Sequence, residues 1–473
     1  MSRESKLAKN TVIYFIGSFG SKMLSFLLLP VYSNYLTQEA YGNYDLIHTI
    51  IQIAYPAITL MLDNAMYVYL IGTNNFDRKN RIISFSVKTL VRNSGIAIIV
   101  CLFINHLQPV KYMFWIILWL ITFSVHNMWI QICRGYNQQK LYSLAGIVVT
   151  AVTLVGNIAG LVILKQDYRF LMVSNCLAYL IAVLLIEHRL HPLRVIQKGY
   201  PDRALKKELL KYSIPLLPNQ LSWWILNVSD RLMIVYYLGT GANGVYAMAC
   251  KIPAILNVVH SVFSAAWSDD ILTSADMRET EKYAEKIYNI YIRVMIGISI
   301  ILIASNRFVF EYIISGNFVE AYKYTYFLYV GSIFSAIGSC LGAFYGYYKK
   351  SLNVSLSTIA AAIVNFLINL VFLSKFGIQV ASISTCAGSI VIWIIRLLGL
   401  RGMVTVRISG INKLMFLILV PFYFTSYIDG LWRNILLIMA AVCIAILINF
   451  RTIHEVEKKF FNKILNKRES KDA

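Results

Sequence analysis

Basic residues inside apolar stretches are the part of this sequence best suited to chemistry. A charged side chain at the centre of a membrane helix costs about 2.5 to 3.5 kcal/mol unless it meets water or a partner. Lys22, Arg92, Arg231 and Lys251 lie deep in such stretches, and Lys and Arg bind phosphate and carboxylate groups through charge-assisted hydrogen bonds. We expect these four residues to bind an anionic ligand, and outward snorkelling of Arg231 and Lys251 is the alternative.

Three further basic residues lie closer to the ends of their apolar stretches. Lys88 precedes Arg92 by four residues and shares its helix face, so snorkelling and ligand binding stay equal alternatives for it. Arg293 and Arg396 lie near the expected inner ends of their helices. We expect both of these arginines to snorkel to the membrane surface.

Acidic residues at membrane depth are fewer than basic ones. Asp45 and Asp63 fall in the second apolar stretch, Asp230 falls in the seventh, and Asp269 and Asp270 end the eighth. Neighbours at i and i+1 on a helix do not face each other, so Asp230 is not automatically a partner of Arg231. We expect Asp63 and Asp230 to position the basic residues or to take part in ion coupling.

Motifs for covalent or metal chemistry are missing from the sequence. There is no Walker A motif, no HExxH, no GxSxG, and the seven cysteines are scattered singly through apolar segments. We therefore expect no enzyme, no catalytic residue, no metal site and no cofactor. His260 is expected to be a packing residue, and a proton-coupling role is its alternative.

The composition shows which elements must carry these residues. Of 473 residues, 58% are hydrophobic and 14% are charged, whereas soluble proteins carry about 25% charged residues. Apolar stretches long enough to span a bilayer recur throughout, so we predict an all-α, polytopic membrane protein with about 14 helices. The expected spans are residues 10–36, 42–72, 82–105, 112–133, 141–164, 169–188, 212–238, 244–270, 287–306, 322–347, 352–373, 377–399, 411–428 and 432–450.

The net charge of +21 arises from Lys and Arg in short loops. Most of these residues fall on one side if the N-terminus is cytoplasmic, so the positive-inside rule predicts both termini in the cytoplasm. A membrane orientation signal therefore explains the charge better than nucleic acid does. The first apolar stretch is too long for a signal peptide and is expected to remain as a helix.

A repeat divides the chain into two halves. The pattern YLxxxAxGxY begins at Tyr35 and recurs at Tyr237, 202 residues later. In each half it joins the first span to the second on the outer side, and we expect its glycine to supply a turn or a helix start. We predict two six-helix lobes, related by a pseudo-two-fold axis along the membrane normal, and two added helices. The expected parts are an N-terminal lobe at 1–190, a basic cytoplasmic linker at 191–211, a C-terminal lobe at 212–400, helices 13 and 14 at 401–450, and a basic cytoplasmic tail at 451–473.

The deep charges come from corresponding helices of the two halves. Lys22 and Asp63 belong to spans 1 and 2, and Arg231 and Lys251 belong to spans 7 and 8. We expect them to share a water-filled cavity between the lobes. Because this cavity would be positively charged, it favours an anionic substrate.

Two long segments carry a resemblance to a known family. They are KNTVIYFIGSFGSKMLSFLLLPVYSNYLTQEAYGNYDLIHTI and YSIPLLPNQLSWWILNVSDRLMIVYYLGTGANGVYAMACKI, with YGNYD, SIP, SWW, DR and GVYA as the sharpest parts. The chain resembles, over essentially its whole length, the oligosaccharide repeat-unit flippase (O-antigen flippase-like), or polysaccharide transporter, branch of the multidrug/oligosaccharidyl-lipid/polysaccharide exporter superfamily.

The resemblance implies a function and a location. Such proteins move undecaprenyl-diphosphate-linked oligosaccharides to the outer leaflet of the bacterial cytoplasmic (inner) membrane for surface polysaccharide biosynthesis. It implies Lys22, Arg231 and Lys251 as diphosphate contacts, with Arg92 assisting. It also implies a lipid-linked glycan, membrane lipids and polysaccharide polymerase machinery as partners. Two alternatives remain. An ion-coupled exporter of organic cations would favour acids over bases in its cavity. A membrane-embedded glycan polymerase would carry a large outer loop.

Overall fold

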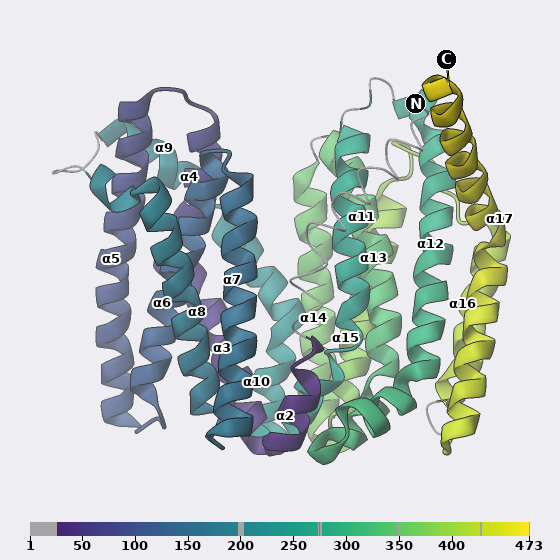
Figure 1. Cartoon of the computed structure of the whole chain (residues 1–473), viewed down its shortest axis with the longest axis horizontal. Helices are drawn as coiled ribbons and strands as arrows, with labels where there is room; N and C mark the ends of the chain where they lie inside the picture. Colours follow the sequence, from purple (N-terminus) through teal and green to yellow (C-terminus); the bar gives the residue numbers. More distant parts are fainter. Residues whose placement is uncertain are drawn as a thin grey trace. The chain divides into compact units, whose positions relative to one another are not determined.

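A computed structural model describes residues 26–196, 203–272, 274, 277–348, 350–425 and 428–472. Every regular element in these ranges is a helix (Figure 1). The chain forms two compact units, one within Ile16–Ala247 and one within Met248–Ala473. The prediction of an all-α, multi-pass membrane protein is confirmed.

The described residues of the first unit form nine α-helices. They are α2 (Leu29–Tyr35), α3 (Gln38–Thr59), α4 (Leu62–Ile71), α5 (Phe76–Leu107), α6 (Met113–Gly135), α7 (Gln139–Ile158), α8 (Arg169–Leu190), α9 (Arg203–Ser213) and α10 (Leu216–Ala249). A π-helical turn extends α7, and a 3-10 turn follows α8. Within this unit α6, α7 and α8 pack side by side (Figure 1).

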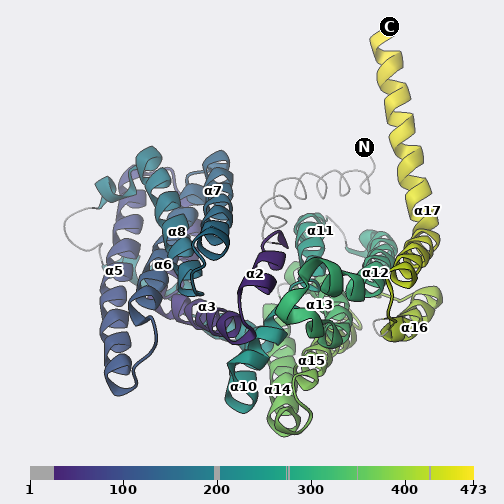
Figure 2. The ribbon, with the colours of Figure 1, turned by 60° about the horizontal axis from the view of Figure 1, so that its bottom comes forward.

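Seven α-helices are seen in the part of the second unit that the structure describes. They are α11 (Ala254–Leu272), α12 (Met277–Phe308), α13 (Tyr326–Tyr347), α14 (Ser351–Phe376), α15 (Gln379–Gly399), α16 (Gly410–Thr425) and α17 (Leu431–Asp472). Here α15 packs against both α13 and α14, while α12 packs against α16 and α17 (Figure 2).

The described residues contain nine single helices that are long and apolar enough to cross a membrane, or up to eleven spans when each bent helix pair counts as one. The expected count of 14 is not confirmed. Most of the first expected span lies outside the described residues, and α16 has only 16 residues. The expected spans 7 and 8 form one bent pair, Val228–Ala249 with Ala254–Leu272.

The second expected span is broken into α3 and α4, which meet at an angle of 57°. The Thr37 hydroxyl caps the start of α3 by accepting a hydrogen bond from the Ala40 amide at 3.1 Å. Pro56 weakens the helix because it lacks an N–H donor, and Leu60 and Met61 then adopt left-handed backbone angles, with φ of 52° and 55°. The break therefore follows from one proline and two strained residues.

The repeated glycines bring α3 and α10 into backbone contact. A Cβ atom on Gly42 would overlap the Thr240 carbonyl oxygen, and one on Gly244 would overlap the Gln38 carbonyl oxygen. The Asn243 amide donates a buried hydrogen bond of 2.9 Å to the Gly42 carbonyl. Of the two expected roles, a turn or a helix start, Gly42 has the second, because it lies near the start of α3, and both glycines lie within helices and serve close packing. The break in α10 instead falls at Gly239, where φ is 88°.

The two units divide between Ala247 and Met248, within the last turn of α10, whereas the sequence predicts that the second lobe begins at residue 212. The helix α9, which lies in the expected linker, packs against α4 through its buried Leu205 and Leu209. The assignment of six helices to each lobe stays a prediction.

We predict that Gly42→Ala lowers the free energy of unfolding by about 1 to 3 kcal/mol, because the added methyl group must displace backbone on α10. The measurement is the thermal unfolding midpoint of the purified protein in detergent. Gly146→Ala in α7 is the matched control, since nothing lies within 4 Å of a Cβ built there. Equal midpoints for the two variants would contradict the close packing.

Candidate functional site

A largely buried ion pair joins α3 to α10 in the first unit. The Arg231 Nε atom lies 2.7 Å from Asp45 Oδ2, and the two side chains are 18% and 7% exposed. Sequence reasoning placed both residues at membrane depth but did not pair them, because they are far apart in the chain. One signal in the sequence pointed to such a pair. Asp230 and Arg231 are neighbours at i and i+1 and do not face each other on a helix, so Arg231 needed an acid from another helix.

Asp230 lies next to this ion pair in sequence and has its own partner. Its carboxylate is 1% exposed and accepts a hydrogen bond of 2.9 Å from the Tyr246 hydroxyl. Tyr246 is the last tyrosine of the second YLxxxAxGxY repeat. The repeat therefore contributes a glycine to the contact with α3 and a hydroxyl to a buried acid.

Asp63 and Arg92 both lie at the break between α3 and α4. The Asp63 carboxylate, 2% exposed, accepts hydrogen bonds from the Tyr55 hydroxyl and from the Asn64 amide. Arg92 on α5 is exposed and donates two bonds of 3.1 Å to the Asn93 side chain.

Asn93 also reaches back to the backbone of the broken helix. Its amide donates at 2.8 Å to the Ile58 carbonyl, which lies just before the two left-handed residues. In a membrane helix each carbonyl freed by a break must find another donor. Asn93 supplies this donor and so connects Arg92 to the break.

Two expected anion-binding residues are not brought to this site by described contacts. Lys22 lies outside the described residues. Lys251 is half-buried in the turn between α10 and α11 and belongs to the second unit. A cavity shared by Lys22, Asp63, Arg231 and Lys251 therefore stays a prediction.

Arg396 in the second unit corrects the snorkelling prediction. It is 2% exposed, and its guanidinium donates to the Ser357 hydroxyl at 2.9 Å, the Gly338 carbonyl at 3.1 Å and the Thr358 hydroxyl at 3.2 Å. Neutral acceptors from α13 and α14 surround it, so it does not need the membrane surface. Its position near the end of α15 was visible in the sequence, but these acceptors were not.

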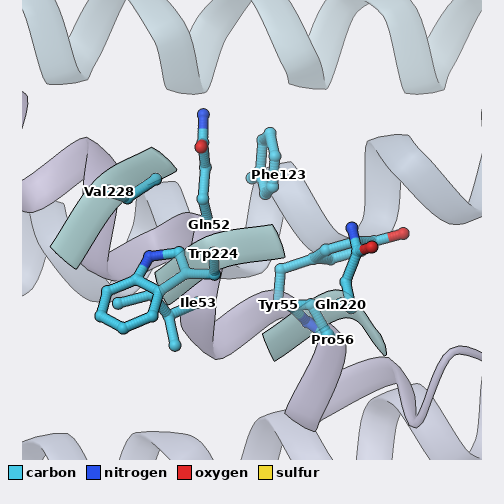
Figure 3. A pocket seen from close by; sticks show the side chains of 8 residues that line it. All are labelled: Gln52, Ile53, Tyr55, Pro56, Phe123, Gln220, Trp224 and Val228. Carbon is cyan, nitrogen blue, oxygen red and sulfur yellow. The ribbon is translucent and has the colours of Figure 1, made fainter. Parts of the chain in front are cut away.

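A cavity of about 310 Å³ opens between α3, α6 and α10 in the first unit (Figure 3). Its polar and aromatic lining comes from Gln52, Tyr55, Phe123, Gln220 and Trp224, and its other lining residues are apolar. Sequence reasoning missed this cavity, because Trp and Gln on membrane helices carry no distinctive spacing. Among the described residues, no group of three or more His, Cys, Asp or Glu side chains could hold a metal ion.

This arrangement of apolar helices is similar to that of two solved membrane proteins. The chain superposes on lipid II flippase MurJ in an inward closed conformation with a TM-score of 0.69 and 14% identity, over 93% of this chain and 99% of that one. It superposes on an inward-facing multidrug resistance MATE family transporter of the MOP superfamily with a TM-score of 0.60 and 16% identity, over 85% of this chain and 96% of that one. At these identities the similarity shows the fold alone.

A sequence model described as "Polysaccharide biosynthesis protein" matches residues 7–267, and the chain belongs to this family. It is also 23% identical over 269 residues to "Lsg locus putative protein 1" of Haemophilus influenzae. That match covers 55% of this chain and 65% of the relative, which is less than two thirds of its length.

We predict that Asp45→Asn and Arg231→Gln each destabilise the protein, because each leaves the other charge poorly compensated at low dielectric. Loss of one partner of a buried pair costs about 3 to 5 kcal/mol, and partial exposure of Arg231 places the expected cost at the lower end. A double-mutant cycle on unfolding free energies should give a coupling of about 1 to 3 kcal/mol. Strict additivity would show that the two charges do not stabilise each other.

Proposed function

We propose that this protein is a flippase that moves undecaprenyl-diphosphate-linked oligosaccharide repeat units from the inner to the outer leaflet of the bacterial cytoplasmic membrane by alternating access. The product would supply the biosynthesis of O-antigen, capsule or exopolysaccharide. Membership of the polysaccharide biosynthesis family over residues 7–267 carries this proposal. The fold similarity to a lipid II flippase supports it.

Arg231 supplies the chemistry that the substrate requires. Its planar guanidinium is held by Asp45 and can exchange this carboxylate for a phosphate, which presents the same pair of acceptor oxygens. In the proposal Lys22 and Lys251 also bind the diphosphate and Arg92 assists. No bond in the substrate is broken, so the protein acts as a transporter and not as an enzyme.

The remaining features of the proposal concern orientation and coupling. Both termini lie in the cytoplasm, as the distribution of loop Lys and Arg predicts. Asp63 and Asp230 take part in ion coupling, and each accepts a hydrogen bond from a tyrosine hydroxyl that would respond to its protonation. Membrane lipids and the polymerase machinery that receives the glycan are the proposed partners.

A cation exporter is the second candidate, because the fold is also similar to that of a multidrug transporter. Such a protein needs carboxylates that a cation can reach. In the first unit Asp45 is paired with Arg231, and Asp63 and Asp230 accept tyrosine hydrogen bonds. These partners favour the anionic substrate.

We predict that the protein, reconstituted in vesicles, moves a fluorescent undecaprenyl-diphosphate oligosaccharide to the outer leaflet, where an outside quencher reaches it. The double variant Arg231→Gln, Lys251→Gln should slow this movement at least about tenfold, which corresponds to a free-energy change of 1.4 kcal/mol. Lys375→Gln, at an exposed position in the last turn of α14, is the matched control. Circular dichroism and the unfolding midpoint would show that each variant is folded. Export of a cationic dye without any movement of the lipid would overturn the proposal.

We further predict that a proton gradient accelerates transport and that Asp63→Asn removes this acceleration, because asparagine cannot take up the proton. The readout is the ratio of initial rates with and without the gradient. Asp167→Asn is the control, since Asp167 lies in a loop where it pairs with Lys111 at 3.4 Å. An unchanged ratio in Asp63→Asn would exclude coupling through this residue.

A further inference from the structure

The cavity between α3, α6 and α10 has a lining suited to a neutral, hydroxylated ring. Trp224, Phe123 and Tyr55 supply aromatic surface, and Gln52 and Gln220 supply amide groups (Figure 3). An amide both donates and accepts hydrogen bonds, as a sugar hydroxyl does. Aromatic faces carry partial negative charge and attract the C–H groups on the apolar face of a pyranose.

Trp224 is one of the residues that line this cavity. The indole N–H of Trp224 is buried and has no hydrogen-bond partner among the described residues. In Figure 3 the Trp224 indole and the Gln52 side chain lie at the same cavity.

The cavity lies at a defined distance from the ion pair. Gln52 follows Asp45 by seven residues on α3, and Trp224 precedes Arg231 by seven residues on α10. Seven residues are two helical turns, so each spacing is about 10 Å along the same helix face. A ligand with its phosphate at Arg231 would therefore place a nearby sugar at Gln52 and Trp224.

The size and charge of the cavity narrow the class of ligand. Its volume of about 310 Å³ is at the lower end of small-molecule sites, which span about 300 to 1,000 Å³. No charged side chain is among its lining residues. A cation would lack a carboxylate there, and a lipid tail would leave the two amides unsatisfied.

We infer that this cavity is a sugar subsite, which binds one ring of the glycan close to the diphosphate. The inference rests on the proposed function, because that function supplies the lipid-linked glycan. The subsite would let the protein select a sugar-bearing lipid over the bare lipid diphosphate. Selection of this kind is separate from the charge recognition at Arg231.

The direct test is ligand-observed NMR. The wild-type protein in nanodiscs is mixed with the methyl glycosides of glucose, galactose and N-acetylglucosamine, and saturation transfer from protein to sugar is measured. We expect transfer to at least one glycoside and an affinity loss of about tenfold in Trp224→Ala, which corresponds to 1.4 kcal/mol. Gln220→Leu, at an exposed position, should weaken binding with less risk to folding. Trp432→Ala is the matched control, because Trp432 is 77% exposed on α17.

A transport assay tells a wrong sugar-subsite inference apart from a wrong proposed flippase function. Movement of undecaprenyl diphosphate with one N-acetylglucosamine is compared with movement of the bare lipid. We expect Trp224→Ala to lower the preference for the sugar-bearing lipid, and Trp432→Ala to keep it. If the wild type moves neither lipid, the proposed function fails, and the NMR arm still decides whether the cavity binds sugar.

Three results would overturn the subsite. The first is the absence of saturation transfer to every glycoside in the wild type. The second is an unchanged sugar preference and affinity in both Trp224→Ala and Gln220→Leu. The third is Trp224-dependent binding of tetraphenylphosphonium with no binding of the neutral glycosides, which would assign the cavity to organic cations.

Discussion

The backbone contact between α3 and α10 is the constraint on which the first unit depends. Gly42 and Gly244 lack side chains, so carbonyl oxygens of the opposite helix occupy the space that a Cβ would need. This proximity lets Asn243 reach the Gly42 carbonyl and lets Arg231 reach Asp45. In a bilayer the hydrophobic effect does not drive helices together, because lipid tails are as apolar as the side chains. Close packing of small residues and polar contacts between helices hold them together instead. The same contact places Gln52 and Trp224 on either side of one cavity.

Polar groups in this fold are satisfied mainly by neutral partners. Tyrosine hydroxyls donate hydrogen bonds to Asp63 and Asp230. Two hydroxyls and a backbone carbonyl accept hydrogen bonds from Arg396. At low dielectric an unpartnered charge is far more costly than a partnered one, so each deep charge requires helices that bring such groups to it. The buried Asp45 carboxylate is paired with a cation, Arg231, instead.

The break between α3 and α4 connects local strain to the site. Leu60 and Met61 hold left-handed backbone angles, and the carbonyl of Ile58 is taken by Asn93 rather than by its own helix. Residues in such conformations persist only where their surroundings fix them. Asp63, Tyr55 and Arg92 all lie at this break, so a change in the protonation of Asp63 would act where the helix is already bent.

Composition and apolar length determined the class of this protein, because a span across hydrocarbon must satisfy its own backbone hydrogen bonds and is therefore helical. The sequence likewise located the deep charges and the repeated glycines, since residue type and spacing along one chain suffice for both. Only the tertiary structure decided what these residues do. Gly42 and Gly244 allow close backbone contact between two helices, Arg231 pairs with Asp45, and Arg396 is buried among hydroxyls. Each outcome depends on which helix lies opposite, and spacing along the chain does not specify neighbours that are 38 to 201 residues away.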